Sequence, residues 1–273
     1  MVNLSQVFKR SRNILIGAAH FPPLLGYVTT PGLRVAEKVV TADVRAFVRG
    51  GMDGVIIENN YDLPHTQFVH PETIASMAMV GTRIRALVRK PLGVNVLWND
   101  YRSAFALASA LDLAFIRIPV FVDRVRTSCG IINGDPRAVA QYRKHVHAES
   151  VAVLADIHVK HATLLSRHTL LQSARLAFRQ GADAIVVTGR WTGEAPELQT
   201  LKDLRKQLGA SRYIFIGSGV DARNAKDLMR YANGAIVSTS LKVGSAGTHG
   251  VNVKHWNQRI SVQKVRALRK QVP

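Results

Sequence analysis

The segment LADIHVKHATLL, residues 154–165, gathers several side chains that could do chemistry. It starts as an apolar run typical of a strand and then presents Asp156, His158, Lys160 and His161. A charge buried alone in an apolar core costs several kcal/mol or neutralises. Either this strand end opens into a cleft, or these groups satisfy one another. If the chain stays extended, alternation places Asp156, His158 and Lys160 on one side.

Three kinds of chemistry are open to this segment. A metal site would use Asp156 and His158 with Glu58 or His20, although no compact ligand motif is present. A Schiff base at Lys160 would require a desolvated site that lowers its pKa. The favoured hypothesis is general acid–base chemistry on a phosphorylated or hydroxylated substrate. A purely structural polar network is the remaining alternative. We therefore predict Glu58, Asp156, His158 and Lys160 as catalytic residues, no metal ligands and no required cofactor.

The elements that must position these residues follow a regular alternation. Short Val- and Ile-rich runs, most of them nearly continuous in apolar residues, are typical of parallel strands buried on both faces. We expect eight of them, at residues 14–20, 54–59, 92–97, 113–120, 151–156, 184–189, 213–219 and 234–240. Helical patterns lie between and after them, at residues 34–50, 71–90, 100–111, 136–148, 168–181, 197–208, 222–231 and 261–271. This alternation predicts a single (β/α)8 barrel over residues 1–273 rather than an open doubly wound sheet.

Every predicted strand becomes polar at its carboxyl end, which is the catalytic face of such barrels. The residues at these ends include His20, Glu58, Asn59, Asn95, Arg117, Asp156, Thr188, Ser218, Thr239 and Ser240. A single polar residue at a strand end often only bonds loop backbone, but convergence from eight strands predicts a ligand site at this rim. We expect His20, Asn59 and Asn95 to contact the ligand there.

The last two predicted strands end in sequences that suit an anion. Gly217 and Gly219 would let backbone N–H groups approach it closely, and a helix starting near Asp221 would point its positive end at the same place. Strands seven and eight usually supply the phosphate site of a barrel. Plain tight turns are the alternative. The predicted anion-binding residues are Gly217, Ser218, Gly219, Ser238, Thr239, Ser240 and Lys242.

The sequence VTGRWTGEAPEL, residues 187–198, predicts a flexible loop after the sixth strand. Gly189 and Gly193 could serve as hinges of a lid over a substrate, with Thr188 and Thr192 facing the ligand. A solvent loop with capping residues is the alternative interpretation.

Many motifs, in a consistent order, resemble the BtpA family. They are GAAHFPPLLG, GGMDGVIIENNYDLP, PETIASM, PLGVNVLWND, LADIHVKHA, IVVTGRWTGEAPEL, GSGVDARNAKDLM and GAIVSTSLK, and they span about residues 13–243. The resemblance implies a phosphate-binding TIM barrel, in a grouping that includes SgcQ-like proteins. The family is named after a membrane-associated cyanobacterial protein needed for photosystem I biogenesis. Ser238 stands where the family pattern has Gly, which narrows the approach of an anion or supplies a hydroxyl donor.

The charge balance is strongly basic. Lys and Arg total 37 against 18 acids, a formal charge of +19, with no acid before Glu37 or after Asp227. Such an excess favours anionic partners. The alternative is that the charge reflects a basic proteome or an adaptation for solubility and recognises no partner. We interpret the basic start as a short lead-in rather than a signal peptide. The last helix should pack its apolar stripe on the barrel and leave its charges solvated.

Two classes of function follow from these observations. The first is an enzyme acting on a phosphorylated small molecule, such as a sugar phosphate or nucleotide derivative. The second is a non-catalytic assembly factor whose basic surface meets a membrane or partner complex. Nucleic-acid binding is disfavoured because no recognised module is present. No apolar run reaches the ~18 residues of a spanning helix, and the lone Cys129 excludes an internal disulfide. We expect a cytoplasmic protein, at most peripheral to a membrane, and a homo-oligomer stays open.

Overall fold

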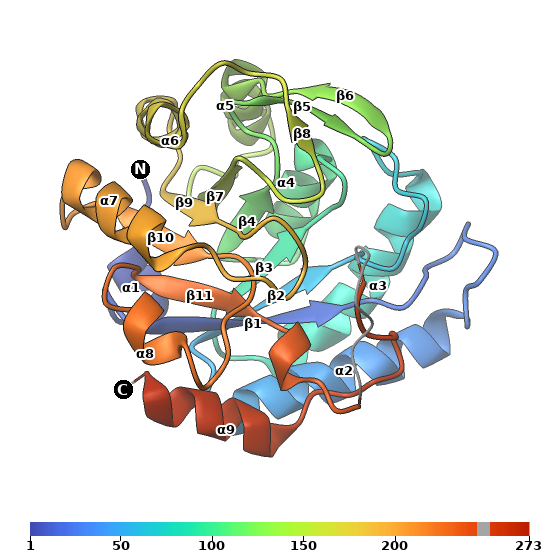
Figure 1. The fold of residues 1–273 in the computed structure, drawn as a ribbon. Helices are drawn as coiled ribbons and strands as arrows, with labels where there is room; N and C mark the ends of the chain where they lie inside the picture. The colour runs from blue at the N-terminus through green and yellow to red at the C-terminus, as the bar shows by residue number, and fades with distance from the viewer. Residues whose placement is uncertain (245–251, 273) are drawn as a thin grey trace.

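The computed structural model describes residues 1–244 and 252–272, and its centre is a closed parallel barrel of eight strands (Figure 1). In barrel order these are β1 Ile14–His20, β2 Gly54–Glu58, β3 Leu92–Asn95, β4 Phe115–Ile118, β7 Ala152–Ile157, β9 Ala184–Val187, β10 Tyr213–Ile216 and β11 Gly234–Val237. Each coincides with a predicted strand, and every neighbouring pair is parallel. The (β/α)8 prediction is confirmed.

Helices follow the strands around the outside of the barrel. They are α2 Leu33–Gly50, α3 Pro71–Leu87, α4 Tyr101–Ala110, α5 Pro136–His145, α6 Leu170–Arg179, α7 Leu198–Leu208, α8 Ala225–Leu228 and α9 Val262–Gln271. The helix predicted at 222–231 is much shorter than expected. The reason is a turn in which Asp221 accepts the N–H groups of Arg223 and Asn224, so that the helix begins only at Ala225.

The strands separate two apolar layers by simple alternation. Ile14, Ile16 and Ala18 of β1 point into the barrel, whereas Leu15 and Ala19 point to the helices. Because both faces are buried, each strand is apolar throughout, as the sequence pattern predicted.

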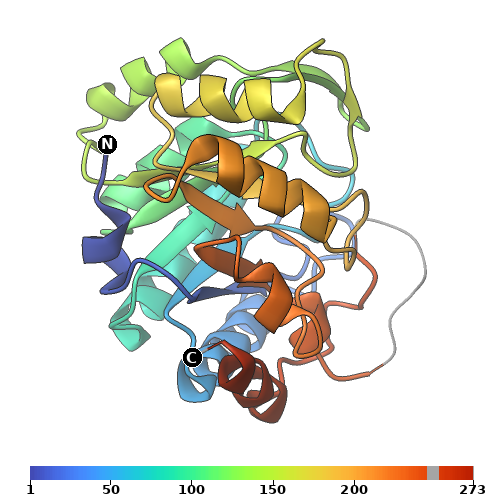
Figure 2. The same ribbon diagram turned by 60° about the vertical axis from the view of Figure 1, so that its left-hand side comes forward.

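A short helix that the sequence pattern did not predict closes the amino-terminal end of the barrel. The basic lead-in contains α1 Leu4–Phe8, visible at the left in Figure 2. The Phe8 ring lies 5.5 Å from that of Phe115 and 6.2 Å from that of Phe215, both inside the barrel. Substrate access through this end is therefore blocked, and the opposite end is the open one.

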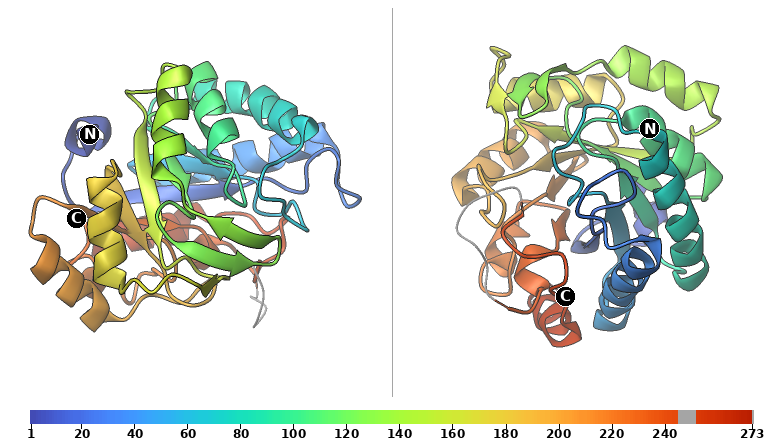
Figure 3. Two further views of the ribbon diagram at one scale, coloured as in Figure 1. Left: turned by 90° about the horizontal axis from the view of Figure 1, so that it is seen from above. Right: turned by 90° about the vertical axis from the view of Figure 1, so that its right-hand side faces the viewer.

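A small antiparallel sheet lies outside the barrel, at the upper right of Figure 1 and facing the viewer in the left view of Figure 3. It consists of β5 Arg124–Thr127, β6 Gly130–Asn133 and β8 Thr163–Leu164. Its residues Val125 and Ile132 pack with Trp98 and Val159 in a separate apolar cluster. The segment after the fourth barrel strand, expected to be a loop, is thus an ordered hairpin that supports one wall of the site.

The basic last helix packs as predicted. Val265 and Leu268 of α9 are fully buried, and the helix lies beside α2 in Figure 1. The guanidinium group of Arg269 on this helix donates a hydrogen bond to Asp53 Oδ2 at 2.8 Å. Within the described residues, no helix is long and apolar enough to cross a membrane.

Candidate functional site

A cavity of about 400 Å³ opens at the carboxyl ends of the barrel strands. It collects most of the residues predicted from the sequence. Those that line it are His20, Glu58, Asn95, Asp156, Lys160, Thr192, Gly217, Ser218, Gly219, Ser238, Thr239 and Ser240. The rim predicted from the polar strand ends therefore bounds a cavity large enough for a small metabolite.

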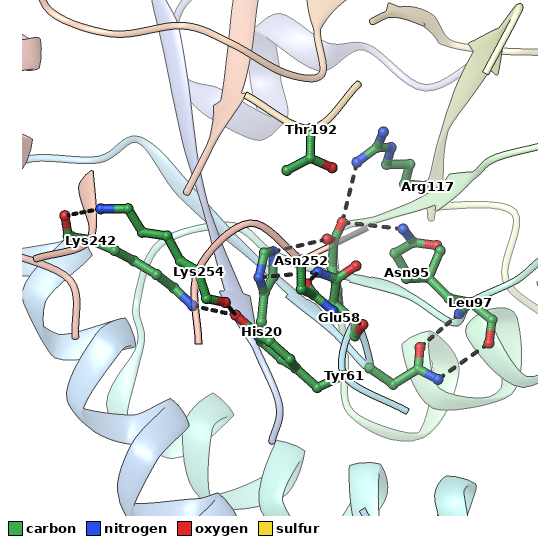
Figure 4. Close-up of polar contacts among 12 residues, drawn as sticks. His20, Glu58, Tyr61, Asn95, Leu97, Arg117, Thr192, Lys242, Asn252 and Lys254 are labelled. Atoms are coloured by element: carbon green, nitrogen blue, oxygen red, sulfur yellow. Dashed lines mark hydrogen bonds and ion pairs between the residues drawn. The ribbon is translucent and has the colours of Figure 1, made fainter. Parts of the chain in front are cut away.

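Strand register explains why three of these side chains meet. His20 pairs with Glu58 across β1 and β2, and Glu58 pairs with Asn95 across β2 and β3. Residues at one level of neighbouring strands point to the same face. Glu58 is consequently 3.4 Å from His20 Nε2 on one side and accepts a 3.2 Å hydrogen bond from Asn95 Nδ2 on the other (Figure 4).

Arg117 of β4 is the centre of the polar floor. Its Nε and Nη2 donate to the two oxygens of Asp156, each at 2.8 Å, and its Nη1 lies 3.4 Å from Glu58 Oε1. All three groups are almost fully buried. The fork of a guanidinium matches a carboxylate in this bidentate way, and such a pair compensates charges that burial would otherwise make costly.

The pairing fixes the protonation of the floor. Burial alone would raise the pKa of Glu58, but His20, Arg117 and Asn95 outweigh it and lower that pKa to about 2. Burial lowers the pKa of His20, which Glu58 only partly opposes, so the imidazole is neutral at pH 7. Burial raises the pKa of Asp156, and Arg117 opposes this shift. At neutral pH Glu58 therefore acts as a fixed negative charge, not as a proton donor.

Lys160 enters the same cavity without a fixed partner. Among the described residues, no hydrogen bond or ion pair within 4 Å engages its ammonium group. Desolvation, helped by the charge of Arg117, lowers its pKa to about 8, while Glu58 and Asp156 act in the opposite direction. About a tenth of the amine is thus neutral near pH 7, far more than for an ordinary lysine, so Lys160 can both accept protons and act as a nucleophile.

The turns after β10 and β11 form the other wall and present backbone groups. The N–H groups of Gly219, Val220, Thr239 and Ser240 make no hydrogen bond with any described residue. The Ser238 hydroxyl is buried and lacks a partner within the same part of the chain. A buried hydroxyl is normally satisfied, so Ser238 and the backbone N–H groups beside it indicate a ligand or water that they would bind.

Gly219 has a different role from the predicted one. A Cβ there would lie 2.0 Å from Ala195 N, and the residue has a φ of +72°. Its lack of a side chain therefore admits the chain's own loop between β9 and α7, not primarily a ligand. The Ser218 hydroxyl, which accepts from Gly189 N at 3.2 Å and donates to Glu194 O at 2.6 Å, clasps the same loop.

The loop between β9 and α7 also forms part of the cavity wall. Thr192 and Gly193 line the cavity, and the Thr192 hydroxyl lies 2.8 Å from His161 Nε2. Trp191 is largely exposed, and its ring is 5.6 Å from that of His161. The lid predicted for residues 187–198 is thus in contact with the neighbouring loop after β7 in this structure.

Five predicted site residues do not line the cavity. The strand β7 ends at Ile157, and His158 takes a left-handed φ of 47° with its N–H bonded to Asp123 Oδ2 at 3.1 Å. The expected alternation breaks there, so His158 turns away from Asp156 and Lys160. The same structural finding argues against the metal set that combined Asp156 with His158.

The other four are engaged elsewhere. Asn59 is fully buried and bonds both backbone groups of Leu97. Thr188 and Gly189 lie behind the wall, at the base of the loop. Lys242 donates to the Tyr61 hydroxyl at 3.0 Å (Figure 4). It borders a smaller hollow beside the main cavity. Burial lowers its pKa to about 8, so a lowered lysine pKa is not confined to the main cavity.

Sequence reasoning also missed residues that line the cavity. Arg117 was recognised only as a strand-end residue, because a lone Arg gives no sign of the acids it will pair with. His65 and His161 both border the cavity, and burial lowers the pKa of each to about 4. The signals were present, since His65 ends the IIENNYDLPH motif and His161 belongs to LADIHVKHA. In the described residues, no group of three or more His, Cys, Asp or Glu side chains could hold a metal ion.

The fold and the cavity define a (β/α)8 barrel protein with a cavity at the carboxyl ends of its strands. The sequence model of the BtpA family matches residues 11–267, and the chain belongs to this family. It is 37% identical over 248 residues to the photosystem I biogenesis protein BtpA of Synechocystis sp., covering 88% of this chain and 84% of that protein. It is 34% identical over 247 residues to an uncharacterised protein of Pyrococcus horikoshii, covering 88% and 92%.

Solved structures with the same architecture are distant in sequence. A thiamine phosphate pyrophosphorylase from Pyrococcus furiosus superposes with a TM-score of 0.59 at 13% identity, covering 96% of both chains. A phosphoribosyl anthranilate isomerase from Thermus thermophilus gives 0.56 at 11% identity, covering 94% and 97%. A structure described as native KDPGal gives 0.55 at 14% identity, covering 94% and 93%. At these identities the similarity shows the fold alone.

Proposed function

We propose that the protein is an enzyme that binds a phosphorylated small molecule in the rim cavity. The phosphate contacts the turns after β10 and β11, and the rest of the substrate extends toward Lys160 and the Arg117 floor. One observation carries the proposal: the backbone N–H groups of Gly219, Val220, Thr239 and Ser240 share one cavity with the Lys160 amine, and none of them has a partner among the described residues. Backbone donors aimed at a concavity are a recurrent way to hold phosphate.

The distribution of charge supports this division of labour. Arg117 and Lys160 carry positive charge, Glu58 and Asp156 carry negative charge, and all four line the same cavity. These charges balance one another, so the floor by itself has little net attraction for a dianion. The phosphate is therefore better accommodated by the neutral donors of the β10 and β11 turns. Names of two distant barrels, a thiamine phosphate pyrophosphorylase and a phosphoribosyl anthranilate isomerase, fit the same substrate class.

The chemistry proposed for the site differs in one respect from the sequence-based hypothesis. The carboxylates of Glu58 and Asp156 were expected to transfer protons, but both are held by Arg117. Glu58, with a pKa of about 2, accepts protons poorly at neutral pH, and both oxygens of Asp156 are occupied by hydrogen bonds from Arg117. We therefore assign them to orienting Arg117 and to balancing positive charge, and we assign proton transfer to Lys160.

Thermal unfolding in inorganic phosphate tests the proposal. The wild type should be stabilised more by phosphate than by chloride at equal ionic strength, because a ligand that binds only the folded state raises Tm. Ser238→Ala should reduce this response, since its hydroxyl is a buried unpaired donor in the cavity. Thr188→Val is the matched control, because its hydroxyl is also buried and unpaired but lies outside the cavity. Equal responses to phosphate and chloride in the wild type would contradict the proposal.

A second candidate function is assembly of a membrane complex, and the name of the cyanobacterial relative is the observation that favours it. The +19 charge suits an anionic leaflet. However, the apolar side chains Val265 and Leu268 of α9 are buried against the rest of the protein, so they are not available to enter a lipid bilayer. Attraction would be electrostatic, at ~1 kcal/mol per nearby basic residue, and would fade with salt. Flotation with anionic vesicles should show binding only at low salt, and retention at high salt would favour the assembly role.

A further inference from the structure

Burial lowers the pKa of three lysines, Lys160, Lys242 and Lys254, but their ammonium groups differ in what they contact. The ammonium group of Lys242 donates a hydrogen bond to the Tyr61 hydroxyl at 3.0 Å. It also lies over the Tyr61 ring, 5.1 Å from the ring centroid. Lys160 lines the large cavity, and no described residue accepts a hydrogen bond from it. Lys254 also lines the cavity, but its Nζ donates to the carbonyls of Lys242 and Gly244, each at 2.9 Å. Among these lysines, only Lys160 offers an uncommitted amine.

We propose that Lys160 forms a covalent iminium with a substrate that carries an aldehyde or ketone as well as a phosphate. This inference rests on the proposed function and names the substrate class. The unpaired Lys160 amine and the donor-rich turns after β10 and β11 border one cavity of about 400 Å³. A compact phosphorylated carbonyl compound can therefore meet both at once.

The step balances without another reactant. The neutral amine adds its nitrogen lone pair to the carbonyl carbon, and the carbonyl oxygen takes up a proton to give a carbinolamine. Loss of that oxygen as water, with a second proton, leaves the iminium. Counted from the ammonium form, two of its three protons leave in the water and one stays on nitrogen.

The surroundings of Lys160 suit this product. An iminium carries the same single positive charge as the ammonium it replaces, so Glu58 and Asp156 can balance both states. Arg117 holds the two carboxylates in place and also disfavours a proton on Lys160. Desolvation acts in the same direction, and together they supply the neutral amine that the addition needs.

Pyridoxal 5′-phosphate is a suitable probe because it combines an aldehyde with a phosphate. The protein is incubated with it near stoichiometry, reduced with borohydride, digested and mapped by mass spectrometry. We expect one phosphopyridoxyl group on Lys160. Pyridoxal, which lacks the phosphate, should label Lys160 much less, and inorganic phosphate should compete with the phosphorylated probe.

Variants separate this chemistry from general lysine reactivity. Lys160→Met should abolish the adduct, whereas Lys242→Met should retain it although Lys242 has the same lowered pKa of about 8. Circular dichroism checks that both variants are folded, and the wild-type peptide map is informative even if one is not. Labelling of surface lysines or Lys254 without Lys160 overturns the proposal.

The two proposals fail in different ways. If Lys160 is labelled equally by pyridoxal and by its phosphate, without competition by phosphate, the iminium chemistry is supported and the phosphate site is wrong. If Lys160 stays unlabelled while phosphate still raises Tm, the phosphate site is supported and the iminium is overturned.

Discussion

The polar groups on the two walls of the cavity differ in whether they have hydrogen-bond partners. On the wall formed by β2, β3, β4 and β7, side chains satisfy one another through Arg117, Glu58 and Asp156. On the wall formed by the turns after β10 and β11, backbone N–H groups and the Ser238 hydroxyl have no partner among the described residues. The charged groups of the first wall are paired with one another, although Asn95 Oδ1 has no partner there, whereas the donors of the second wall lack partners among the described residues.

This difference indicates where substrate binding energy can arise. Groups already paired gain little from a ligand, because a new contact must replace an old one. Unpaired buried donors gain the full benefit of a hydrogen bond that the free protein lacks. Lys160 has charged neighbours, Glu58, Asp156 and Arg117, but no described residue forms a hydrogen bond with it. Four variants test this contrast, from the largest expected effect to the smallest.

Arg117→Met should be the most damaging change. It leaves two buried carboxylates, those of Glu58 and Asp156, without their cation, and breaking a buried pair in this way costs ~3–5 kcal/mol. Urea unfolding at pH 7 should show the loss. Arg223→Ala removes an exposed partner of Asp221 and should leave the midpoint unchanged. A stable Arg117→Met protein would mean that the paired wall is not a buried ion network.

Glu58 should make the protein sensitive to acid. Its pKa is lowered from 4.5 to about 2 on folding, so its stabilising contribution is complete above pH 4.5 and is lost as pH falls toward 2. A shift of this size corresponds to ~3 kcal/mol. Unfolding free energy measured across this window should fall less steeply in Glu58→Gln than in the wild type. Parallel curves for the two proteins would refute the role of Arg117 and His20 in holding this carboxylate ionised.

Gly219→Ala tests the contact between the unpaired wall and its loop. The new Cβ would meet Ala195 N at 2.0 Å, whereas a Cβ at Gly181 meets nothing within 4 Å. The matched control is Gly181→Ala. Both glycines have positive φ, so both substitutions carry a similar cost in backbone conformation. We expect Gly219→Ala to be the less stable by ~2 kcal/mol, because the overpacked loop must move. Equal melting temperatures would show that the loop is not held against this turn.

Lys160→Met should give the smallest effect, and with the opposite sign. Removing an unpaired, desolvated ammonium should stabilise the protein at pH 7 by ~1 kcal/mol, with water in the cavity screening part of the cost. The pKa of Lys160 falls from 10.5 to about 8 on folding, so wild-type stability should rise between pH 8 and 10.5. The advantage of the variant should shrink over that window in thermal scans. A variant less stable than the wild type at pH 7 would indicate a partner for this ammonium.

Much of the fold could be predicted because its signals are local. Continuous apolar runs such as Ile14–His20 must be buried on both faces, and their alternation with helices allows few other topologies. The same logic brought the polar strand ends to one rim. It missed α1, whose five residues carry no periodic pattern, and the β5–β6 hairpin, whose strands are short and mostly exposed.

The sequence by itself determined the barrel, its open end and most of the residues around the cavity. Only the tertiary structure decided which of them are free to act. Arg117 and Asp156 are 39 residues apart, and Arg117 and Glu58 are 59 apart, so their pairing depends on the strand order that places β2, β3, β4 and β7 side by side. A left-handed turn at His158 and the Tyr61 contact of Lys242 remove two predicted residues from the site. Residue type sets what a side chain can do, but its chemical role depends on the partners that folding brings within about 3 Å of it.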